Sequence, residues 1–159
     1  MALRKVVMVG EGSLRKKSKP VKEFNEDLWS LLDDMKETMY ANDGMGFAAP
    51  QVGILRRVII VDVNNTFIEL INPEITSKKG EDIEEEGCLS VGSFRGRVKR
   101  PYEITVSAYD RYGYPFTIKC EKLLARCICH EVDHLDGILF IDKCLDKDKY
   151  LKQAGLNKM

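Results

Sequence analysis

The chain has 159 residues, the length of a single domain that can bury a core of its own. Hydrophobic residues make up 44% of it and charged residues 31%, as in an ordinary soluble globular protein. Its 25 basic residues balance 25 acidic ones, so no net charge recruits nucleic acid or an anionic membrane. We therefore expect neither sequence-specific nucleic-acid binding nor membrane association.

Features that would direct the chain to another compartment are missing from the sequence. No apolar run approaches the roughly 20 residues of a membrane-spanning helix, and the N-terminus lacks the apolar core of a secretory signal. The cysteines number five, and three of them lie close together at Cys120, Cys127 and Cys129. This suits a reducing compartment better than a disulfide framework. We expect a bacterial cytoplasmic protein, although a mature organellar form would have the same features.

The first predicted element is a helix. Residues 1–24 are basic and loop-like, and the Lys16-Lys17 pair within them could contact a partner. Asn25 is a suitable N-cap, because two acidic residues follow it in the first turn, where negative charge favours the helix dipole. Apolar residues then recur with helical spacing at Leu28, Leu31, Leu32, Met35 and Met39. We predict a helix whose apolar stripe faces the core and which ends at 42–44.

Residues 44–51, Gly-Met-Gly-Phe-Ala-Ala-Pro-Gln, have little side-chain bulk. They predict a tight backbone that another segment can approach closely. The glycines do not form a dinucleotide-binding fingerprint, because no strand precedes them and no third glycine follows in register. Gln51, a polar residue between Pro50 and Val52, is the one that we expect to point into a site.

Apolar runs predict strands at 58–61, 67–71, 104–109 and 115–118. Asn72 and Pro73 are expected to end the second strand, and the last two runs are expected to form a hairpin. Between these pairs lie an acidic stretch, 81–86, expected to be a solvated edge, and then a basic loop.

The most informative stretch is Cys-His-Glu-Val-Asp-His at 129–134. Residues four apart lie one turn apart on the same face of a helix, so His130 and His134 can reach one metal ion. Glu131 follows the first histidine and can reach a water at that ion, which is the arrangement of an H-E-x-x-H metal site. Gly137 is placed to end this helix.

A third protein ligand must be a cysteine or a carboxylate, because the motif uses both histidines of the chain. We favour Cys88, since a thiolate is a strong ligand for borderline metals and this residue lies in a Gly-Cys-Leu-Ser turn. Cys129 points roughly 100° away from the shared helix face. Cys120 and Cys127 fit core packing, and Cys144 lies in a polar tail. A catalytic site would keep a fourth position open for water.

These elements predict an α+β fold in which mixed or antiparallel sheets pack around the central metal-binding helix, with the N-terminal helix as a second one. We interpret residues 1–159 as a single catalytic domain. Its end, residues 141–159, is expected to be a short lysine-rich tail.

Three separated motifs, taken in order, resemble those of the peptide deformylase family. They are 44–51, Glu-Gly-Cys-Leu-Ser at 86–90, and His-Glu-Val-Asp-His at 130–134, and the resemblance extends over nearly the whole chain. It implies hydrolytic removal of the formyl group from the N-terminal methionine of nascent polypeptides, with release of formate. It also implies one divalent metal ion, commonly Fe²⁺, with Zn²⁺, Ni²⁺ or Co²⁺ able to take its place.

The resemblance also implies a role for each site residue. The metal ligands would be Cys88, His130 and His134. Glu131 would transfer the proton, and the Gln51 amide and the Leu89 N–H would stabilise the oxyanion. Gly44, Met45 and Gly46 would bind the substrate, whose backbone would run alongside them as an added strand.

Two further carboxylates are expected to have supporting roles. Asp133 is expected to pair with a basic residue such as Arg100, and Glu86 to anchor its turn. Departures from the family pattern occur at Phe47, Gly92, Arg126 and Cys129. Arg126 stands where a smaller apolar residue often shapes the methionine pocket, and Gly92 replaces a usual proline and loosens the turn that carries Cys88. Substrate preference and the robustness of the metal site are therefore the properties that we expect to differ. The tail is short, so the long C-terminal helix that some members use on the ribosome is expected to be absent or abbreviated, and ribosome docking stays an open expectation.

Two other functions use the same helix motif. A zinc endopeptidase would need a downstream His or Glu ligand, but Asp136 is too close and the remaining carboxylates lie in the tail. A non-catalytic module with a structural metal would need a closed shell of four ligands. It would also leave Glu131 and Gln51 without a role.

Overall fold

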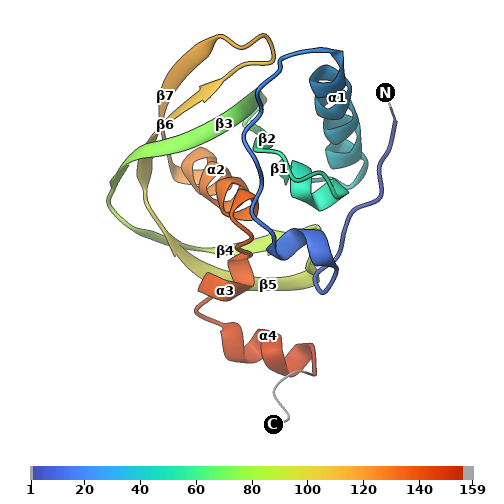
Figure 1. Cartoon of the computed structure of the whole chain (residues 1–159). Helices are drawn as coiled ribbons and strands as arrows, with labels where there is room; N and C mark the ends of the chain where they lie inside the picture. The colour runs from blue at the N-terminus through green and yellow to red at the C-terminus, as the bar shows by residue number, and fades with distance from the viewer. Residues whose placement is uncertain (1, 156–159) are drawn as a thin grey trace.

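The computed structural model describes residues 2–155 and places one helix, α2, between a five-stranded sheet and a two-stranded hairpin (Figure 1). The helices are α1 (Glu26–Ala41), α2 (Lys122–Leu135), α3 (Phe140–Lys143) and α4 (Lys147–Gln153), with 3₁₀ helices at Gly12–Arg15 and Ala49–Val52. The strands are β1 (Gly46–Ala48), β2 (Val58–Val63), β3 (Thr66–Lys79), β4 (Asp82–Cys88), β5 (Gly92–Arg100), β6 (Glu103–Tyr109) and β7 (Pro115–Glu121).

All strand pairings are antiparallel, and the large sheet has the order β1-β2-β3-β6-β7, whereas β4 pairs with β5 alone. The predicted α+β fold, with antiparallel sheets around a central helix, is confirmed. Among the described residues, no helix combines the length and apolar content needed to cross a membrane.

The sequence of β2 reflects the helices that cover both faces of the large sheet. Ile59 and Val61 belong to the apolar cluster that also contains the buried side of α2. Val58 and Ile60 belong to the cluster formed with α1. Because both faces are covered, β2 is a continuous apolar run instead of an alternating one.

The two long helices have the predicted boundary residues. Asn25 caps α1, since its side-chain oxygen accepts a hydrogen bond from the Leu28 N–H with an N–O distance of 3.4 Å. After the C-cap Asp136, Gly137 adopts a φ of 75°, the left-handed conformation that commonly ends helices. A Cβ at Gly137 would lie 2.6 Å from the Arg15 carbonyl oxygen, so glycine is required where the N-terminal segment crosses the end of α2.

One predicted strand end is wrong, because β3 runs on past Asn72 and Pro73. Its register on β6 shifts between Ile71 and Glu74, so a bulge accommodates the residue that lacks an N–H donor. Asn72 has a φ of 52°, and its side chain hydrogen-bonds the Val21 N–H at 2.8 Å and the Val21 carbonyl at 2.9 Å. The strand is irregular here but does not stop.

The predicted basic loop is also wrong, because these residues form β5. Every second residue is buried, among them Phe94 and Val98, while the basic side chains between them mostly point outward. The acidic stretch forms β4 and pairs with β5, so that Glu85 lies opposite Arg97. Opposite charges on paired strands stabilise such a hairpin. Glu86 differs from its acidic neighbours in being buried.

The described part of the predicted tail packs against the hairpin. Cys144, expected in a polar tail, is instead buried. Phe94 of β5 contacts Phe140 and Tyr150, with ring-centroid distances of 6.2 and 5.1 Å. The apolar residues among the lysines therefore attach α3 and α4 to β5. Residues 156–159 of the predicted tail lie outside the described part of the chain.

Candidate metal centre and active site

Three side chains with metal-binding atoms meet between the end of β4 and one face of α2. One ligand atom from each of Cys88, His130 and His134 lies within 4.8 Å of the other two. Cys88 Sγ is 3.3 Å from His134 Nε2, and the two imidazole centroids are 5.2 Å apart. One thiolate and two imidazoles suit a borderline divalent ion such as Zn²⁺ or Fe²⁺. Cys129 is buried in the core cluster and does not join this group.

Glu131 lies beside the three candidate ligands in a buried position. Its Oε1 atom has no hydrogen-bond partner among the described residues. An unpaired buried carboxylate oxygen is costly, so its place next to three ligand atoms fits a site that a metal ion and its water complete. Burial raises the pKa of Glu131 to about 7. A Cβ at Gly46 would lie 2.5 Å from Glu131 Oε2, so the absence of a side chain on β1 makes room for this carboxylate.

The Gln51 side chain is buried and points into the site, as expected from the sequence. Its Oε1 accepts a hydrogen bond from the Ala48 N–H at 3.0 Å, and its Nε2 donates to Ser90 Oγ at 3.0 Å and to Cys88 Sγ at 3.6 Å. These contacts fix the amide with an N–H directed at the candidate ligand. In the neighbouring turn, the Leu89 N–H donates to no backbone carbonyl of residues 2–155. Gln51 and Leu89 both line the pocket into which the candidate ligands open.

A buried group of charges lies behind His130. The His130 Nδ1 atom is 2.9 Å from Glu86 Oε1, and because a carboxylate accepts, the ring donates here and keeps its other nitrogen for a metal. Arg100 donates to both Glu86 oxygens, at 2.9 and 3.0 Å, and to Asp133 at 2.6 Å. The expected contact between Asp133 and Arg100 is thus present. Burial alone would raise the pKa of Glu86, but the hydrogen bonds from His130 and Arg100 outweigh it and hold this pKa well below its ordinary value.

Three contributors to the site were not predicted in their observed roles. Ser90 accepts the hydrogen bond that orients Gln51. The Phe140 ring stacks on the His130 imidazole, with centroids 6.0 Å apart and an interplanar angle of 23°. The Arg126 guanidinium donates to Glu86 at 2.6 Å instead of filling the pocket. Only Phe140 had a sequence signal, the apolar run that follows Gly137; the contacts of Ser90 and Arg126 depend on tertiary structure alone.

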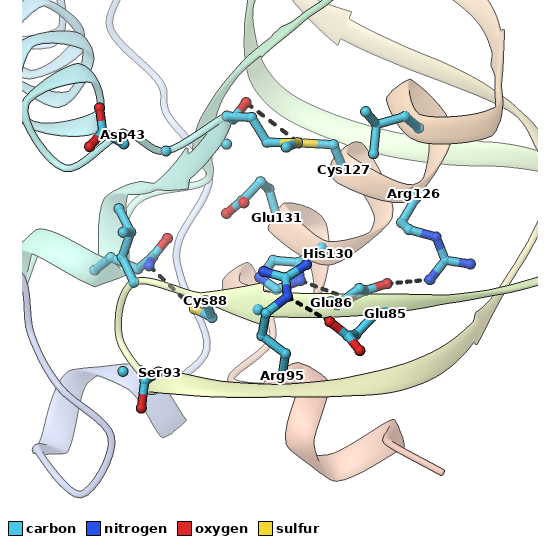
Figure 2. Close-up of a pocket in the computed structure, with 18 residues that line it drawn as sticks. Asp43, Glu85, Glu86, Cys88, Ser93, Arg95, Arg126, Cys127, His130 and Glu131 are labelled. Carbon is cyan, nitrogen blue, oxygen red and sulfur yellow. Dashed lines mark hydrogen bonds and ion pairs between the residues drawn. The ribbon is translucent and has the colours of Figure 1, made fainter. Parts of the chain in front are cut away.

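The site opens into a pocket of about 510 Å³, which Figure 2 shows. Residues 44–46 and residues 85–89 both line it, and Leu123, Arg126 and Cys127 add a wall from α2. Within residues 2–155, the sheet order leaves β1 at the edge of the large sheet and pairs β4 with β5 alone, so each strand has an edge that no other described strand covers. Open strand edges can take up an extended peptide through main-chain hydrogen bonds.

Comparison with known proteins identifies relatives of this chain. The family model described as "Polypeptide deformylase" matches residues 3–150. A peptide deformylase of Caldanaerobacter subterraneus is 52% identical over 152 residues, which cover 94% of this chain and 96% of the relative. One from Caldicellulosiruptor bescii is 52% identical over 145 residues, which cover 91% of this chain and 87% of the relative.

Solved structures of peptide deformylases share the fold. The one from Legionella pneumophila matches with a TM-score of 0.91 and 42% sequence identity, covering 98% of this chain and 94% of that chain. The one from Ehrlichia chaffeensis, in complex with actinonin, matches with a TM-score of 0.92 and 32% identity, covering 99% of each chain. This chain therefore belongs to the polypeptide deformylase family.

Proposed function

We propose that Cys88, His130 and His134 hold one divalent metal ion in a single catalytic domain, residues 1–159, and that Glu131 carries the proton transfer. The reaction of the family is removal of the formyl group from N-formylmethionyl nascent peptides, and this chain performs it. The observation that carries the proposed residue roles is the meeting of the three ligand atoms with Glu131 at a pocket between two open strand edges. Neither an endopeptidase nor a structural-metal module has support from the relatives.

The donor set constrains the metal without selecting a single ion. Fe²⁺ is the ion that we propose for the cell, while Zn²⁺, Ni²⁺ and Co²⁺ accept the same ligands. When bound, the ion supplies Lewis acidity, which lowers the pKa of a water molecule and polarises the formyl oxygen. Cys88 would supply a thiolate sulfur and the two histidines ring nitrogens, the ligand types that such ions accept.

Gly44, Met45 and Gly46 are the residues that we propose for binding the peptide backbone. Gly46 begins β1, whose partner on one side is β2 and whose other edge is open. An extended substrate added to this edge is held by main-chain hydrogen bonds, which tolerate many sequences after the first residue. The lack of a side chain at Gly46 leaves Glu131 within reach of the bound formyl group.

In the proposed reaction, Glu131 takes a proton from the attacking water while the oxygen of that water bonds to the formyl carbon. The carbon–nitrogen bond then breaks, formate leaves with the oxygen of the water, and Glu131 returns the proton to the amine of the peptide. Gln51 Nε2 and the Leu89 N–H stabilise the negative charge that develops on the formyl oxygen. Loss of one such donor typically lowers the rate by ~10²–10³-fold.

The test compares wild type with Glu131→Gln, which keeps the size of the side chain and removes the base. Metal-loaded protein is incubated with formyl-Met-Ala-Ser and, separately, with an internal peptide, and formate and cleavage products are assayed. We expect the variant to retain its metal and to release formate at least ~100-fold more slowly. Formate release at the wild-type rate would overturn the role of Glu131, and cleavage of the internal peptide would indicate an endopeptidase.

The setting that we propose is the bacterial cytoplasm, at the ribosome, where nascent peptides emerge. Lys147, Lys149 and Lys152 are exposed on α4 and could contact ribosomal RNA phosphates. Such contacts weaken steeply with salt. Co-sedimentation of the protein with ribosomes at about 50 and 200 mM salt tests this, with a variant in which all three lysines are replaced by glutamine as the control.

A further inference from the structure

We propose that Arg126 is a positioning residue of the metal centre: it holds the Glu86 carboxylate, and Glu86 holds the His130 ring. The inference rests on the proposed metal site and adds a residue to it. Arg126 does not belong to the group of candidate ligands, and it lies one helical turn before His130 on α2. It is also only 4% exposed, although a guanidinium is rarely buried without partners.

The contacts of Arg126 join the two elements that supply the candidate ligands. From α2, its Nη1 donates to Glu86 Oε2 at 2.6 Å and to the Val98 carbonyl at 2.9 Å, and its Nη2 donates to the Asp82 carbonyl at 2.8 Å. Asp82 begins β4 and Val98 lies in β5, so one side chain contacts both strands of the hairpin. The hairpin carries Cys88 and α2 carries both histidines, so this contact fixes their relative position.

Glu86 is saturated with hydrogen bonds only when Arg126 is counted. Its Oε1 accepts from Arg100 Nη2 at 3.0 Å and from His130 Nδ1 at 2.9 Å, and its Oε2 accepts from Arg100 Nε at 2.9 Å and from Arg126 Nη1. A carboxylate held by four donors has one orientation. The carboxylate that receives the other ring N–H of a metal-binding histidine fixes the orientation of that ring.

Arg126 also balances the charge of the buried cluster. Glu86 and Asp133 provide two carboxylates, while Arg100 provides one guanidinium that contacts both. Lys143 reaches Asp133 at 3.0 Å, but its side chain is 45% exposed and lies at the rim. Arg126 supplies a second buried cation, 2.6 Å from Glu86 and 4.0 Å from the Asp82 carboxylate, and a buried charge that loses its partner is strongly unfavourable.

A direct contact between Arg126 and the substrate is the competing interpretation, since the residue also lines the pocket. Figure 2 shows its guanidinium turned toward β4, away from Cys88 and Glu131, with its bond to Glu86 drawn. The three hydrogen bonds described above use both terminal nitrogens of the group. Only the alkyl part of the Arg126 side chain is left to line the pocket. We therefore assign the guanidinium the role of positioning Glu86.

The experiment uses the full chain loaded with Zn²⁺ and follows transfer of the metal to a chromogenic chelator. Arg126→Leu keeps an alkyl wall and removes the charge, and Arg126→Lys keeps the charge but not the fork that reaches both carbonyls. We expect Arg126→Leu to lose Zn²⁺ about 10–100-fold faster than wild type, with Arg126→Lys in between. We also expect kcat to fall at saturating metal while KM for formyl-Met-Ala-Ser changes less than about twofold, because the substrate keeps its wall.

A double-mutant cycle with Glu86→Gln tests whether Arg126 acts through Glu86. If it does, the double variant loses Zn²⁺ much more slowly than the product of the two single effects predicts. Effects that multiply would overturn the proposal, as would metal loss from Arg126→Leu within about twofold of wild type, or a change confined to KM. If Arg126→Leu does not fold, as judged by circular dichroism, the cycle is run with Arg126→Lys.

Arg97→Leu is the matched control. It also removes an arginine of an ion pair from this region, the pair with Asp146, but its side chain is 59% exposed and makes no contact with Glu86. We expect its Zn²⁺ loss to stay within about twofold of wild type, and an effect as large as that of Arg126→Leu would overturn the proposal. Wild-type metal binding and formate release test the proposed function separately, so the two ideas can fail independently.

Discussion

The large sheet and the β4–β5 hairpin meet α2 in different ways. On the sheet side the contacts are apolar, and residues such as Ile59, Val61 and Ile128 are completely buried. On the hairpin side the contacts are charged: Glu86 contacts Arg126 and His130 of α2, and Arg100 contacts Asp133. Apolar packing has no direction, so it sets the place of the helix without orienting particular atoms. Charged hydrogen bonds are directional, and they orient the imidazole on the side where Cys88 approaches.

The hairpin also depends on the rest of the chain more than the sheet does. Two strands alone are at best marginally stable in water. Here β5 gains an apolar face from the C-terminal segment, through the cluster of Phe94, Phe140 and Tyr150. Stability of the hairpin, and with it the position of Cys88, therefore depends on both the buried charges and the C-terminal helices. Four predictions test this contrast.

Arg100→Leu is expected to have the largest effect. The side chain is 3% exposed and is shared by Glu86 and Asp133, so its loss leaves two carboxylates without their common partner. We expect the free energy of unfolding to fall by about 3–5 kcal/mol in urea titrations. Arg95→Leu is the control, because the Arg95–Glu85 pair is more than half exposed, and it should cost less than about 1 kcal/mol. An equal fall in the free energy of unfolding for the two variants would show that burial does not increase the contribution of the charged cluster to stability.

Gly46→Ala tests the sheet side of the site. The added Cβ would lie 2.5 Å from Glu131 Oε2 and 2.7 Å from Cys127 Sγ, so the carboxylate must move. Because small displacements of a reacting group are costly, we expect kcat/KM for a formylated peptide to fall by about 100-fold. Thermal unfolding should change little, since the residue lies at a strand edge. Unchanged activity would mean that Glu131 does not act from its present position.

Ile59→Val should have a smaller effect, confined to stability. The residue is completely buried between the sheet and α2, and removing one methylene should cost about 1 kcal/mol in the free energy of unfolding. The rate of metal loss should stay at the wild-type value, because apolar packing does not orient the imidazoles. A change in metal retention comparable to that of a charged-cluster variant would erase the distinction between the two sides.

The same contrast explains which parts of the structure could be predicted from the sequence. The stripe on α1, the continuous run of β2 and the shared face of His130 and His134 are local patterns, and the structure shows each of them. The sequence does not predict β5, because basic residues and glycine occupy many of its positions. Its partner β4 is mostly acidic and has no alternating apolar residues that would indicate a strand. The Asn72-Pro73 pair predicts a strand end because it locally resembles a turn, whereas in the structure it forms a bulge within β3.

The site divides along similar lines. Candidate ligands follow from residue chemistry and motif spacing, and the structure brings Cys88, His130 and His134 together, although their roles stay predictions. The partners of Glu86 could not be read from the sequence as a set, because they come from β5 and from two turns of α2. A buried ion pair produces no periodic pattern of residue types that would reveal it in the sequence. Only the fold shows that four donors meet on one carboxylate.

The smallest expected effect concerns a pair at the rim of the hairpin. Asp146 accepts hydrogen bonds from the Arg97 N–H at 2.8 Å and from its guanidinium at 3.0 Å, and these bonds lower the pKa of Asp146 to about 2 from an ordinary 3.8. A carboxyl with a lowered pKa stabilises the fold above its ordinary pKa, and that contribution disappears as the pH falls through about 2. In an NMR titration we expect the Asp146 carboxyl signal to stay constant from about pH 5 to 3 and to move near pH 2.

In Arg97→Leu the midpoint for Asp146 should rise from about 2 toward its ordinary 3.8, because the guanidinium is gone and only the backbone N–H of residue 97 still donates to the carboxylate. Arg97 is 59% exposed and neither residue of the pair belongs to the ligand group, so loss of the pair should loosen α4 without faster metal loss. Hydrogen exchange of the α4 amides measures the first effect and chelator competition the second. If Asp146 in the wild-type protein instead titrates with a midpoint of about 4, the contact with Arg97 does not hold the C-terminal helices to β5. The aromatic cluster and the backbone hydrogen bond from the Leu145 N–H to the Arg97 carbonyl, at 2.7 Å, would then hold the C-terminal segment to the hairpin.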